Sequence, residues 1–302
     1  MSKHVAVLKG GWSAEREVSL SSGRECAQAL RDAGYRVTEI DVTRDLDTLI
    51  SALTPRPDVV FNALHGRGGE DGTVQGVLDI LQLAYTHSGL AASALAMDKP
   101  QARKIFAAAG LPIAPGKLVP RAEAASVLPA PFVVKPPNEG SSVGVVIVRK
   151  GDNRPVDSAL PPGDLLLVET YIPGREITVA VMGDRALGAL EIRAAGEWYD
   201  YTAKYAEGGS VHLMPAPVPA VIYDEACRIA LEAHRALGCR GVSRADLRYD
   251  DTKGAPGALF LLEVNTQPGM TPTSLVPDIA RHAGISFVEL VSWMVENAEC
   301  DA

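Results

Sequence analysis

The chain has 302 residues, of which 47% are hydrophobic and 22% are charged, a balance typical of a globular protein rather than a disordered one. A chain of this length can hold roughly two or three domains with their own cores. It carries 29 Lys and Arg against 37 Asp and Glu, a formal net charge of −8. Nucleic acid and anionic membrane surfaces are therefore not expected as partners, since both would be repelled on average.

The N-terminus and the cysteines point to the cytoplasm. The chain opens with a strand-like stretch, Val5–Leu8, and lacks the apolar length and cleavage site of a signal peptide. No apolar run in the sequence is long enough to cross a bilayer. Cys26, Cys227, Cys239 and Cys300 are scattered and form no Cys-x-x-Cys pair, so we expect free thiols in a reducing compartment.

The first hundred residues alternate strand-like and helix-like stretches. In chain order, they are Val5–Leu8, Ser19–Asp32, Arg36–Val42, Leu46–Leu53, Asp58–Leu64 and Thr73–Leu81. This βαβαβ order predicts a parallel sheet wrapped by helices. Because ligands lie at the carboxyl ends of such strands, the loops starting at Lys9 and His65 are candidate binding loops.

Two further regions follow. The second has a helix and then antiparallel strands, an α+β order, at Gln101–Ala109, Phe132–Lys135, Val143–Val148 and Leu165–Glu169. The third begins near Ile177 and ends in helical turns. Its predicted elements are the strands Ile177–Met182 and Ala186–Ile192, the helix Ala220–Leu237, and the strands Val242–Tyr249 and Ala258–Val264.

Two polar pairs stand on the last two predicted strands. Arg244 and Asp246 are two residues apart on one strand, and Glu263 and Asn265 are two apart on the next, so the members of each pair face the same way. If Arg244 lies opposite Glu263 in an antiparallel hairpin, all four side chains share one face. Carboxylate and amide oxygens suit Mg²⁺. A solvated strand face with ordinary ion pairs is the alternative reading.

Other residues are suited to a nucleotide. Lys99 opens a helix and Lys135 ends an apolar strand, and compact ammonium groups bind phosphates well. The turn from Gly140 to Gly144 could cap phosphoryl oxygens with backbone N–H groups, although a plain hairpin turn explains it equally. The strand end at 168–172 offers backbone amides for an adenine edge, and Glu176 offers a carboxylate for a ribose.

Several ordered blocks carry a resemblance to a known family. They are Gly10–Ser19 (GGWSAEREVS), Leu64–Gly72 (LHGRGGEDG), Met97–Lys99, Lys135–Gly144 (KPPNEGSSVG), Asp200–Tyr205 (DYTAKY), Leu262–Thr266 (LEVNT), Pro268–Thr271 and Ser274–Leu275. Over essentially its whole length the chain resembles the ATP-grasp ligases, and within them the D-alanine–D-alanine ligase family. So many blocks in one order are far more specific than a single short motif.

The resemblance implies an ATP-grasp fold that combines α/β and α+β parts. An N-terminal Rossmann-like parallel-sheet substrate domain at 1–96 would precede a central ATP-binding domain at 97–176. A C-terminal ATP-grasp catalytic domain at 177–302 would complete the chain. The family commonly forms a homodimer, and the apolar helices of the first domain favour one here.

The resemblance also assigns roles at the nucleotide. Lys99 and Lys135 would hold ATP phosphates. The resemblance places adenine against Glu169 and the backbone of Tyr171 and Ile172, and the ribose hydroxyls against Glu176. Asp246, Glu263 and Asn265 would hold two Mg²⁺ ions, with Glu263 bridging them. Mn²⁺ could substitute for Mg²⁺, and activation by K⁺ stays open.

The implied reaction joins two D-alanine molecules through an acyl phosphate, for peptidoglycan precursor synthesis in the cytoplasm of a walled bacterium. Arg244 and the backbone N–H of Gly269 would stabilise the oxyanion of the tetrahedral intermediate. In the same scheme the first substrate's ammonium meets Glu15, which Ser141 and Tyr205 assist in a hydrogen-bonded trio.

Four residues would complete the substrate sites. His65 would line the first-substrate pocket, and the second substrate's carboxylate would meet Lys204, Ser274 and Leu275. Glu15 and two of these four residues have structural alternatives that the residues alone leave open. Glu15 is also a first-turn glutamate suited to a helix dipole, His65 could be a structural histidine, and Ser274 is an ordinary helix N-cap.

The chain departs from the family pattern at a few places. Pro137 and Asn138 replace a small-plus-basic pair, and Tyr171 stands where tryptophan is usual. Gln267 and the pair Pro272–Thr273 differ from the usual residues near Ser274, and they bear on the shape of the second-substrate pocket.

Three rival functions are weighed against this one. A ligase of D-alanine with D-lactate or D-serine needs a different second site, and the Lys204–Tyr205 segment resembles the dipeptide-forming type. A nucleotide-binding oxidoreductase would show a Gly-x-Gly-x-x-Gly fingerprint, which the run from Lys9 to Trp12 is not. A non-catalytic ATP-binding regulator would be expected to lack Arg244 or a metal ligand, and the sequence has them all.

Overall fold

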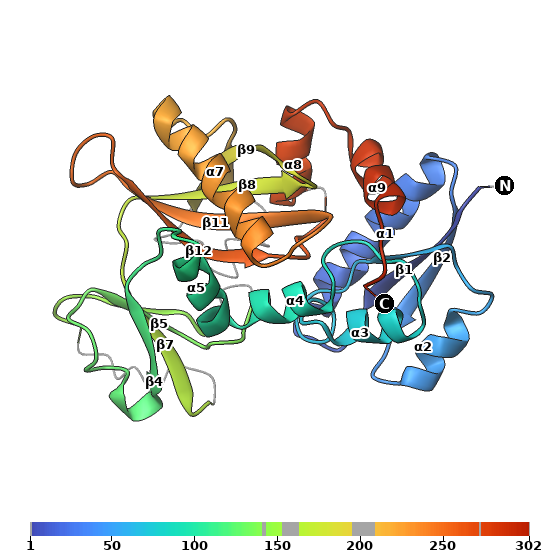
Figure 1. The fold of residues 1–302 in the computed structure, drawn as a ribbon, viewed down its shortest axis with the longest axis horizontal. Coiled ribbons are helices and arrows are strands. Elements are labelled where there is room, and N and C mark those ends of the chain that lie inside the picture. The colour runs from blue at the N-terminus through green and yellow to red at the C-terminus, as the bar shows by residue number, and fades with distance from the viewer. Residues whose placement is uncertain (1, 141–142, 153–162, 195–208, 272, 302) are drawn as a thin grey trace.

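The protein is seen here in a computed structural model that describes residues 2–140, 143–152, 163–194, 209–271 and 273–301. The described residues form three sheets, which lie in separate parts of an elongated molecule (Figure 1). The first, at the N-terminal end, is parallel, and the other two are antiparallel. Mixed α/β and α+β architecture, as predicted, is confirmed.

The N-terminal sheet has the predicted parallel order. Its strands are β1 (His4–Gly10), β2 (Arg36–Val42) and β3 (Val59–Asn62), in the order β2-β1-β3. The connecting helices are α1 (Arg16–Asp32), α2 (Leu46–Ala52) and α3 (Thr73–Ile80). All four residues of β3 are buried, as expected for a strand covered on both faces.

The second sheet is built from α+β elements. Strands β4 (Gly116–Pro120), β5 (Phe132–Lys135), β6 (Val146–Val148) and β7 (Leu165–Thr170) lie in the order β4-β7-β5-β6. A short 3-10 helix, Arg121–Glu123, follows β4. Helices α4 (Leu90–Met97) and α5 (Lys99–Ala108) lead into this region from the N-terminal part (Figure 1).

The third sheet carries most of the site. Its strands β8 (Arg175–Met182), β9 (Arg185–Ala194), β10 (Ser210–Leu213), β11 (Val242–Asp250) and β12 (Ala258–Asn265) lie in the order β10-β9-β8-β11-β12. Alternation along β8 separates its two faces. Ile177, Val179 and Val181 join the core under α7 (Ala220–Ala236), whereas Ala180 and Met182 join the core under α8 (Leu275–His282).

The last helix returns to the beginning of the chain. Helix α9 (Phe287–Glu296) lies against α1, and its Leu290 and Val291 share a core cluster with Val5 and Phe61 (Figure 1). The polypeptide thus crosses twice between the N-terminal sheet and the rest. The proposed domain division at residues 96 and 176 stays a prediction.

Besides the short 3-10 helix, three elements were missed by the sequence analysis. Helix α4 (LAASALAM) is small and apolar throughout, so it shows no amphipathic period. Strand β4 is bounded by Gly116 and Pro120, which read as breakers, and β10 has only four residues. Boundaries also moved: α1 begins at Arg16 rather than Ser19, and β6 begins at Val146 rather than Val143.

Two simpler observations bear on placement. Among the described residues, no helix has the length and apolar character needed to cross a membrane. The four cysteines are free thiols, as expected, and Cys26 is buried in the N-terminal core.

Candidate active site

The polar pairs of β11 and β12 meet on one face, with a register that differs from the expected one. Arg244 lies opposite Asn265 rather than Glu263, and Glu263 lies opposite Asp246. Near the hairpin loop the register is one residue different, because Tyr249 pairs with Leu259. The irregularity next to Asp246 absorbs one residue of β12 and thereby brings both pairs to the same face.

Cationic side chains hold the two carboxylates. Arg244 donates from Nε and Nη2 to the two oxygens of Asp246, at 2.8 and 2.7 Å. Thr178 donates its hydroxyl to Asp246 Oδ1 at 2.6 Å. Lys99 Nζ lies 3.2 Å from Glu263 and donates to the Glu139 carbonyl at 2.6 Å. Arg244 therefore offsets Asp246 within the face, and Lys99 from α5 offsets Glu263.

The donor set of this face fits Mg²⁺. Asp246 and Glu263 are direct neighbours across the hairpin, and Asn265 adds an amide on the same face. These are hard oxygen donors, and Mg²⁺ is usually held by one or two carboxylates with its other positions left to water and phosphate. Among the described residues, no group of three His, Cys, Asp or Glu side chains could hold a metal ion. A metal here would depend on the amide and on a bound nucleotide.

Two pockets adjoin at this face. The first is lined by predicted substrate and catalytic residues, namely Glu15, His65, Arg244, Asn265, Gly269, Ser274 and Leu275. The second is lined by predicted nucleotide and metal residues, namely Lys135, Glu169, Tyr171, Ile172, Glu176 and Asp246. Lys99 and Glu263 line both. The structure therefore brings together all the predicted site residues that it describes.

Loops at the carboxyl ends of β1 and β3 build one wall of the first pocket. Ser13 donates its hydroxyl to the His65 carbonyl at 2.7 Å and accepts from the backbone N of Glu15 at 3.1 Å. Gly66 has φ +67°, and a β-carbon there would stand 2.8 Å from the Glu15 carboxylate. A glycine is therefore needed where this loop passes Glu15. Glu15 stands at the N-cap position of α1, where its side chain makes no capping hydrogen bond.

His65 is buried behind this wall. Its Nε2 lies 3.0 Å from the Ser22 hydroxyl, and the ring also bonds to the backbone of Gln267. Burial lowers the pKa of His65, against the opposing effect of the nearby Glu15 carboxylate, so the ring is neutral at pH 7. His65 both lines the first pocket and makes internal hydrogen bonds. The pocket-lining and the structural interpretation of this residue are therefore compatible.

Glu70 is a pocket residue that the sequence analysis quoted in a motif but gave no role. It lines the first pocket with Glu15, and a β-carbon on Gly140 would lie 3.4 Å from Glu70 and 3.5 Å from Glu15. Burial raises the pKa of Glu70 to about 8, and the charge of Glu15 adds to this shift. Glu70 lies in an irregular loop between β3 and α3, where burial leaves no periodic pattern, so hydrophobic spacing could not have found it.

The second pocket combines an apolar slot with a charged end. Val133, Ile147 and Leu262 provide apolar lining. At its charged end Glu169 is buried between two cations: Lys135 Nζ lies 2.5 Å away, and Arg103 Nη1 donates to the other carboxylate oxygen. The cluster therefore carries a net positive charge.

Arg103 is a second residue that the sequence analysis missed. It also donates to the Ala114 carbonyl at 2.6 Å, and it lies one helical turn after Lys99 on α5. A spacing of four on a helix places both cations on one face, and this signal could have found it.

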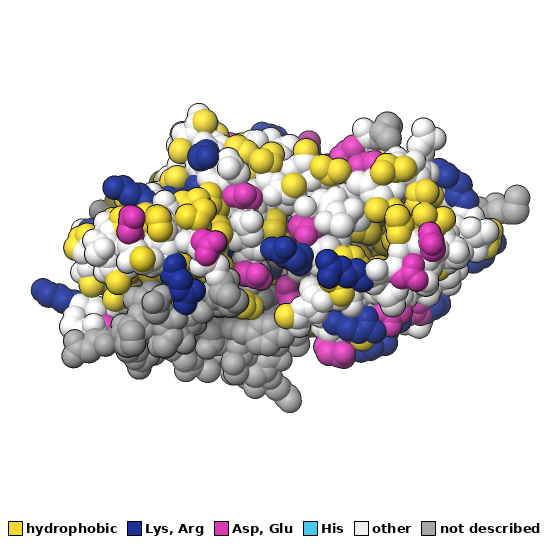
Figure 2. Space-filling model, turned by 90° about the horizontal axis from the view of Figure 1, so that it is seen from below, with side chains coloured by type: hydrophobic (Ala, Val, Ile, Leu, Met, Phe, Trp, Pro, Cys, Tyr) yellow, Lys and Arg dark blue, Asp and Glu magenta, His cyan; other side chains and the backbone are white. Residues whose placement is uncertain are grey.

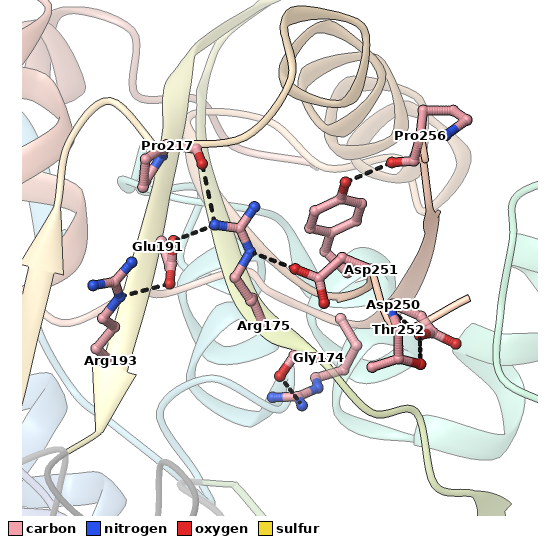
Figure 3. Close-up of polar contacts among 11 residues, drawn as sticks. Gly174, Arg175, Glu191, Arg193, Pro217, Asp250, Asp251, Thr252 and Pro256 are labelled. Atoms are coloured by element: carbon pink, nitrogen blue, oxygen red, sulfur yellow. Dashed lines mark hydrogen bonds and ion pairs between the residues drawn. The ribbon is translucent and has the colours of Figure 1, made fainter. Parts of the chain in front are cut away.

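The opposite side of β8 is anchored by a buried carboxylate. Arg175, the first residue of β8, lies 3.1 Å from Glu191 and 3.2 Å from Asp251, and it donates to the Pro217 carbonyl at 3.1 Å (Figure 3). Glu191 also pairs with Arg193 at 2.8 Å. Since neighbouring residues on a strand face opposite sides, this anchor fixes the strand that presents Glu176 to the second pocket.

The loop before α8 closes the first pocket from the C-terminal side. Ser274 stands at the expected N-cap position of α8, but its side chain makes no capping hydrogen bond. Its hydroxyl instead accepts from the Thr271 backbone N at 3.0 Å and lies 2.8 Å from the Thr271 hydroxyl. A β-carbon on Gly269 would stand 2.9 Å from Ser274 Oγ, so these two predicted residues are immediate neighbours.

Three predicted site residues lie outside the described ranges. They are Ser141, Lys204 and Tyr205, and Pro272 is also outside. Thr273 lines the first pocket, whereas the side chain of Gln267 bonds to residues of the N-terminal part.

The face seen in Figure 2 mixes charges of both signs. Lys and Arg side chains are interspersed there with Asp, Glu and hydrophobic side chains rather than gathered in one basic field (Figure 2). Together with the net charge of −8, this gives no electrostatic footprint for nucleic acid on that face.

Family comparisons agree with this geometry. The family model described as "D-ala D-ala ligase C-terminus" matches residues 106–296, and the one described as "D-ala D-ala ligase N-terminus" matches residues 46–88. The chain is 62% identical over 305 residues to D-alanine–D-alanine ligase of Parvibaculum lavamentivorans, covering 99% of this chain and 98% of the relative. It is 63% identical over 309 residues to that of Paramagnetospirillum magneticum, covering 100% of both.

Solved structures give the same result. The crystal structure of D-alanine–D-alanine ligase from Bacillus anthracis complexed with ATP superposes with a TM-score of 0.83 at 31% identity. The superposition covers 98% of this chain and 97% of that one. The fold is therefore shared from end to end.

Proposed function

Because the chain belongs to the D-alanine–D-alanine ligase family, we propose that its two adjoining pockets join two D-alanine molecules to D-alanyl-D-alanine with conversion of ATP to ADP and phosphate. The observation that carries this proposal is that Lys99 and Glu263 line both pockets. A γ-phosphoryl group bound in the second pocket would thus stand beside a carboxylate bound in the first. The family also implies that the dipeptide serves peptidoglycan precursor synthesis.

The nucleotide would occupy the second pocket. The apolar slot suits the adenine ring, with the backbone of Tyr171 and Ile172 at its edge and Glu176 at the ribose. Lys135 and Lys99 lie at the phosphate end. Glu169, held between Lys135 and Arg103, orients the lysine rather than leaving it mobile in the pocket.

Asp246, Glu263 and Asn265 would hold Mg²⁺ against the phosphates. When bound, the metal offsets the charge repulsion between the γ-phosphate and the attacking carboxylate. Arg244 and Lys99 contact the same two carboxylates. The hard oxygen donors gathered on one strand face support the assignment.

The first step activates the first D-alanine. Glu15 and Glu70 lie near one point of the first pocket and suit its ammonium group, and Arg244 suits its carboxylate. A carboxylate oxygen attacks the γ-phosphorus, the bond to the β-phosphate oxygen breaks, and ADP leaves. The product is D-alanyl phosphate, held in the first pocket.

The second step forms the peptide bond. The amine of the second D-alanine attacks the acyl carbon, the tetrahedral intermediate collapses, and phosphate leaves with the oxygen that bound it. Arg244 and the backbone N–H of Gly269 would stabilise the oxyanion. The second carboxylate would lie at the N-terminus of α8, where Ser274 leaves the backbone N–H groups without a side-chain cap. Ser141, Lys204 and Tyr205 keep their proposed roles beside these groups.

The working assembly is proposed to be a cytoplasmic homodimer. Apolar side chains on the N-terminal helices support this: Ile80 of α3 is 84% exposed, and Leu46 and Ile50 of α2 are 52% and 40% exposed. Exposed large apolar side chains grouped in one part of a protein often mark an interface. Analytical ultracentrifugation of the wild type and of Ile80→Glu tests this, and a monomeric wild type would contradict it.

Product analysis tests the proposed function. Purified protein receives ATP and Mg²⁺ with D-alanine, L-alanine, glycine, or D-alanine plus D-lactate, and products are identified by mass. D-alanyl-D-alanine with one phosphate released per bond is the expected result. Phosphate release only when D-lactate is present would move the assignment to a depsipeptide ligase.

A further inference from the structure

Gln267 joins the strand face of the metal ligands to the loop of the first substrate pocket. It lies two residues after the end of β12 and is 1% exposed. Its backbone N donates to Asn265 Oδ1 at 2.8 Å, and its backbone also bonds to the His65 ring. One residue therefore contacts a proposed metal ligand and a first-pocket residue at the same time.

The side chain of Gln267 reaches into the N-terminal part of the molecule. Its Oε1 accepts from Asn62 Nδ2 at 2.8 Å, and its Nε2 donates to the Leu64 carbonyl. Asn62 is the last residue of β3 and is fully buried. The amide oxygen and the amide nitrogen of Gln267 thus both bond to residues some two hundred positions earlier in the sequence.

Asn62 also forms hydrogen bonds with the loop that carries His65 and Glu70. Its Nδ2 also donates to the Gly69 carbonyl at 3.0 Å, and its Oδ1 accepts from the Leu64 backbone N at 3.1 Å. Gly69 directly precedes Glu70, and Leu64 directly precedes His65. Both ends of the loop that carries His65 and Glu70 are therefore held by one buried amide pair, Asn62 and Gln267.

Gln267 does not act as a pocket residue. Thr266 and Gly269, which flank it along the chain, line the first pocket, whereas the Gln267 amide is satisfied by Asn62 and Leu64. Buried amides with satisfied hydrogen bonds specify one arrangement of the groups around them. Any effect of Gln267 on the reaction must pass through the groups that it holds.

We propose that Gln267 is a positioning residue for the ligase reaction, which sets the first-substrate loop (residues 64–70) in register with the catalytic face of β11 and β12. This inference rests on the proposed function. The position of the D-alanine carboxylate relative to the γ-phosphate then depends on a hydrogen-bonded contact between the N-terminal and C-terminal parts. A misplacement of about 1 Å in such a geometry can cost up to about 10²-fold in rate.

The test compares two buried glutamines. Gln267→Met keeps the size of the side chain but removes its hydrogen bonds. Gln75→Met is the matched control. Gln75 is also 1% exposed, and it donates at 2.9 Å to the Gly69 carbonyl that Asn62 contacts. This bond joins two residues of the N-terminal part and does not involve the C-terminal part. Steady-state rates are measured against D-alanine at saturating ATP and Mg²⁺, and the affinity for an unreactive ATP analogue is measured by calorimetry without D-alanine.

For Gln267→Met we expect kcat/KM for D-alanine to fall roughly 10- to 100-fold, mainly through KM, with the affinity for the ATP analogue unchanged. Gln75→Met should keep the wild-type KM for D-alanine. Equal KM values in the wild type and Gln267→Met, or an equal rise in both variants, would overturn the proposal. A wild type that makes no D-alanyl-D-alanine would instead contradict the proposed function.

A second variant covers the case in which Gln267→Met does not fold. Gln267→Asn keeps the amide but is one methylene shorter, so it cannot reach Asn62 and the Leu64 carbonyl together. It should also raise KM for D-alanine, and hydrogen exchange should rise in residues 64–70 relative to wild type. Wild-type KM together with wild-type exchange in this variant would overturn the proposal.

Discussion

At the scale of single residues, the centre of the site is a carboxylate that belongs to two pockets. Glu263 faces Asp246 across the hairpin, lies 3.2 Å from Lys99 and lines both the substrate and the nucleotide pocket. In the described part of the chain, Glu263 thus combines a proposed metal-binding role with contact to both pockets. Its charge, rather than its shape, should therefore be what the reaction requires.

Glu263→Gln tests this requirement. The variant keeps the side-chain size but removes the negative charge that would hold Mg²⁺, so metal-dependent turnover should be lost while the thermal unfolding temperature stays close to wild type. Turnover is measured by phosphate release across a range of Mg²⁺ concentrations. Near-normal activity at saturating Mg²⁺ would rule out the metal assignment.

Glu70→Gln tests the partly buried carboxyl of the first pocket. The pKa of Glu70 is raised to about 8, against about 4.3 in an unfolded chain, so the folded state holds a proton that the unfolded state loses. Glu70 therefore makes stability fall as pH rises between these two values. As the pH rises from about 5 to about 8.5, the unfolding temperature of Glu70→Gln should therefore rise relative to that of the wild type. A difference that does not change with pH would contradict the shift.

The sequence predicted many of these residues because strand spacing is informative. Asp246, Glu263 and Asn265 follow from a period of two on adjacent strands. Glu70 and Gln267 could not be predicted in the same way. Their environment depends on loops and on chain segments distant in sequence, and burial of a loop residue leaves no periodic pattern.

At the scale of secondary structure elements, β8 depends on a buried ion cluster on the side opposite the nucleotide pocket. Glu191, whose side chain is 3% exposed, holds Arg175 and Arg193 (Figure 3). Breaking a buried pair by removing one charge is costly, because the partner charge stays behind in a poorly solvated place. Such a change should loosen the start of β8 and shift the position of Glu176.

Glu191→Gln should lower the free energy of unfolding by about 1–3 kcal/mol, because it weakens the contact of the partly buried Arg175 with this position. Glu232→Gln is the control: its side chain is 42% exposed in an i,i+4 pair with Arg228 on α7, so its loss should cost about 0.3–0.5 kcal/mol. Urea unfolding at equilibrium measures both. Equal effects of the two substitutions would show that the Glu191 cluster does not anchor the strand.

Element prediction succeeded where the pattern was periodic and failed where tertiary structure decided. Strands β2 and β5 have the predicted bounds, since each is an extended run between clear breakers. The register of β11 with β12 was expected two residues away from the observed one. The position of a bulge depends on which side chains pack on the same face of the sheet. It cannot be predicted from loop length or from strand propensity.

At the scale of the whole molecule, the site is assembled from parts that are far apart in the sequence. The first pocket takes Glu15 and His65 from loops that follow β1 and β3, Lys99 from α5, and Arg244 from β11. Helix α9 packs back onto α1 (Figure 1). The sequence predicted three regions in order, but not this return, because the contact between distant segments leaves no local signal.

Ligand binding should therefore stabilise the whole molecule. An unreactive ATP analogue that binds only the folded state at a hundred times its Kd should add about 2.7 kcal/mol to the free energy of unfolding. At one fixed analogue concentration, the added stability should be larger with Mg²⁺ than without it, because Asp246 and Glu263 would hold the metal against the phosphates and so lower the Kd. Thermal shift measurements at several analogue concentrations check this. Equal shifts with and without Mg²⁺ would contradict the metal site.

The most direct test of the central claim follows one oxygen atom. D-alanine labelled with ¹⁸O in its carboxylate is incubated with ATP and Mg²⁺, and the released phosphate is analysed by mass. If the first D-alanine is activated as an acyl phosphate between the two pockets, each phosphate should carry one labelled oxygen. Dipeptide formation with unlabelled phosphate would contradict the account, because the carboxylate oxygen would then never have bonded to phosphorus.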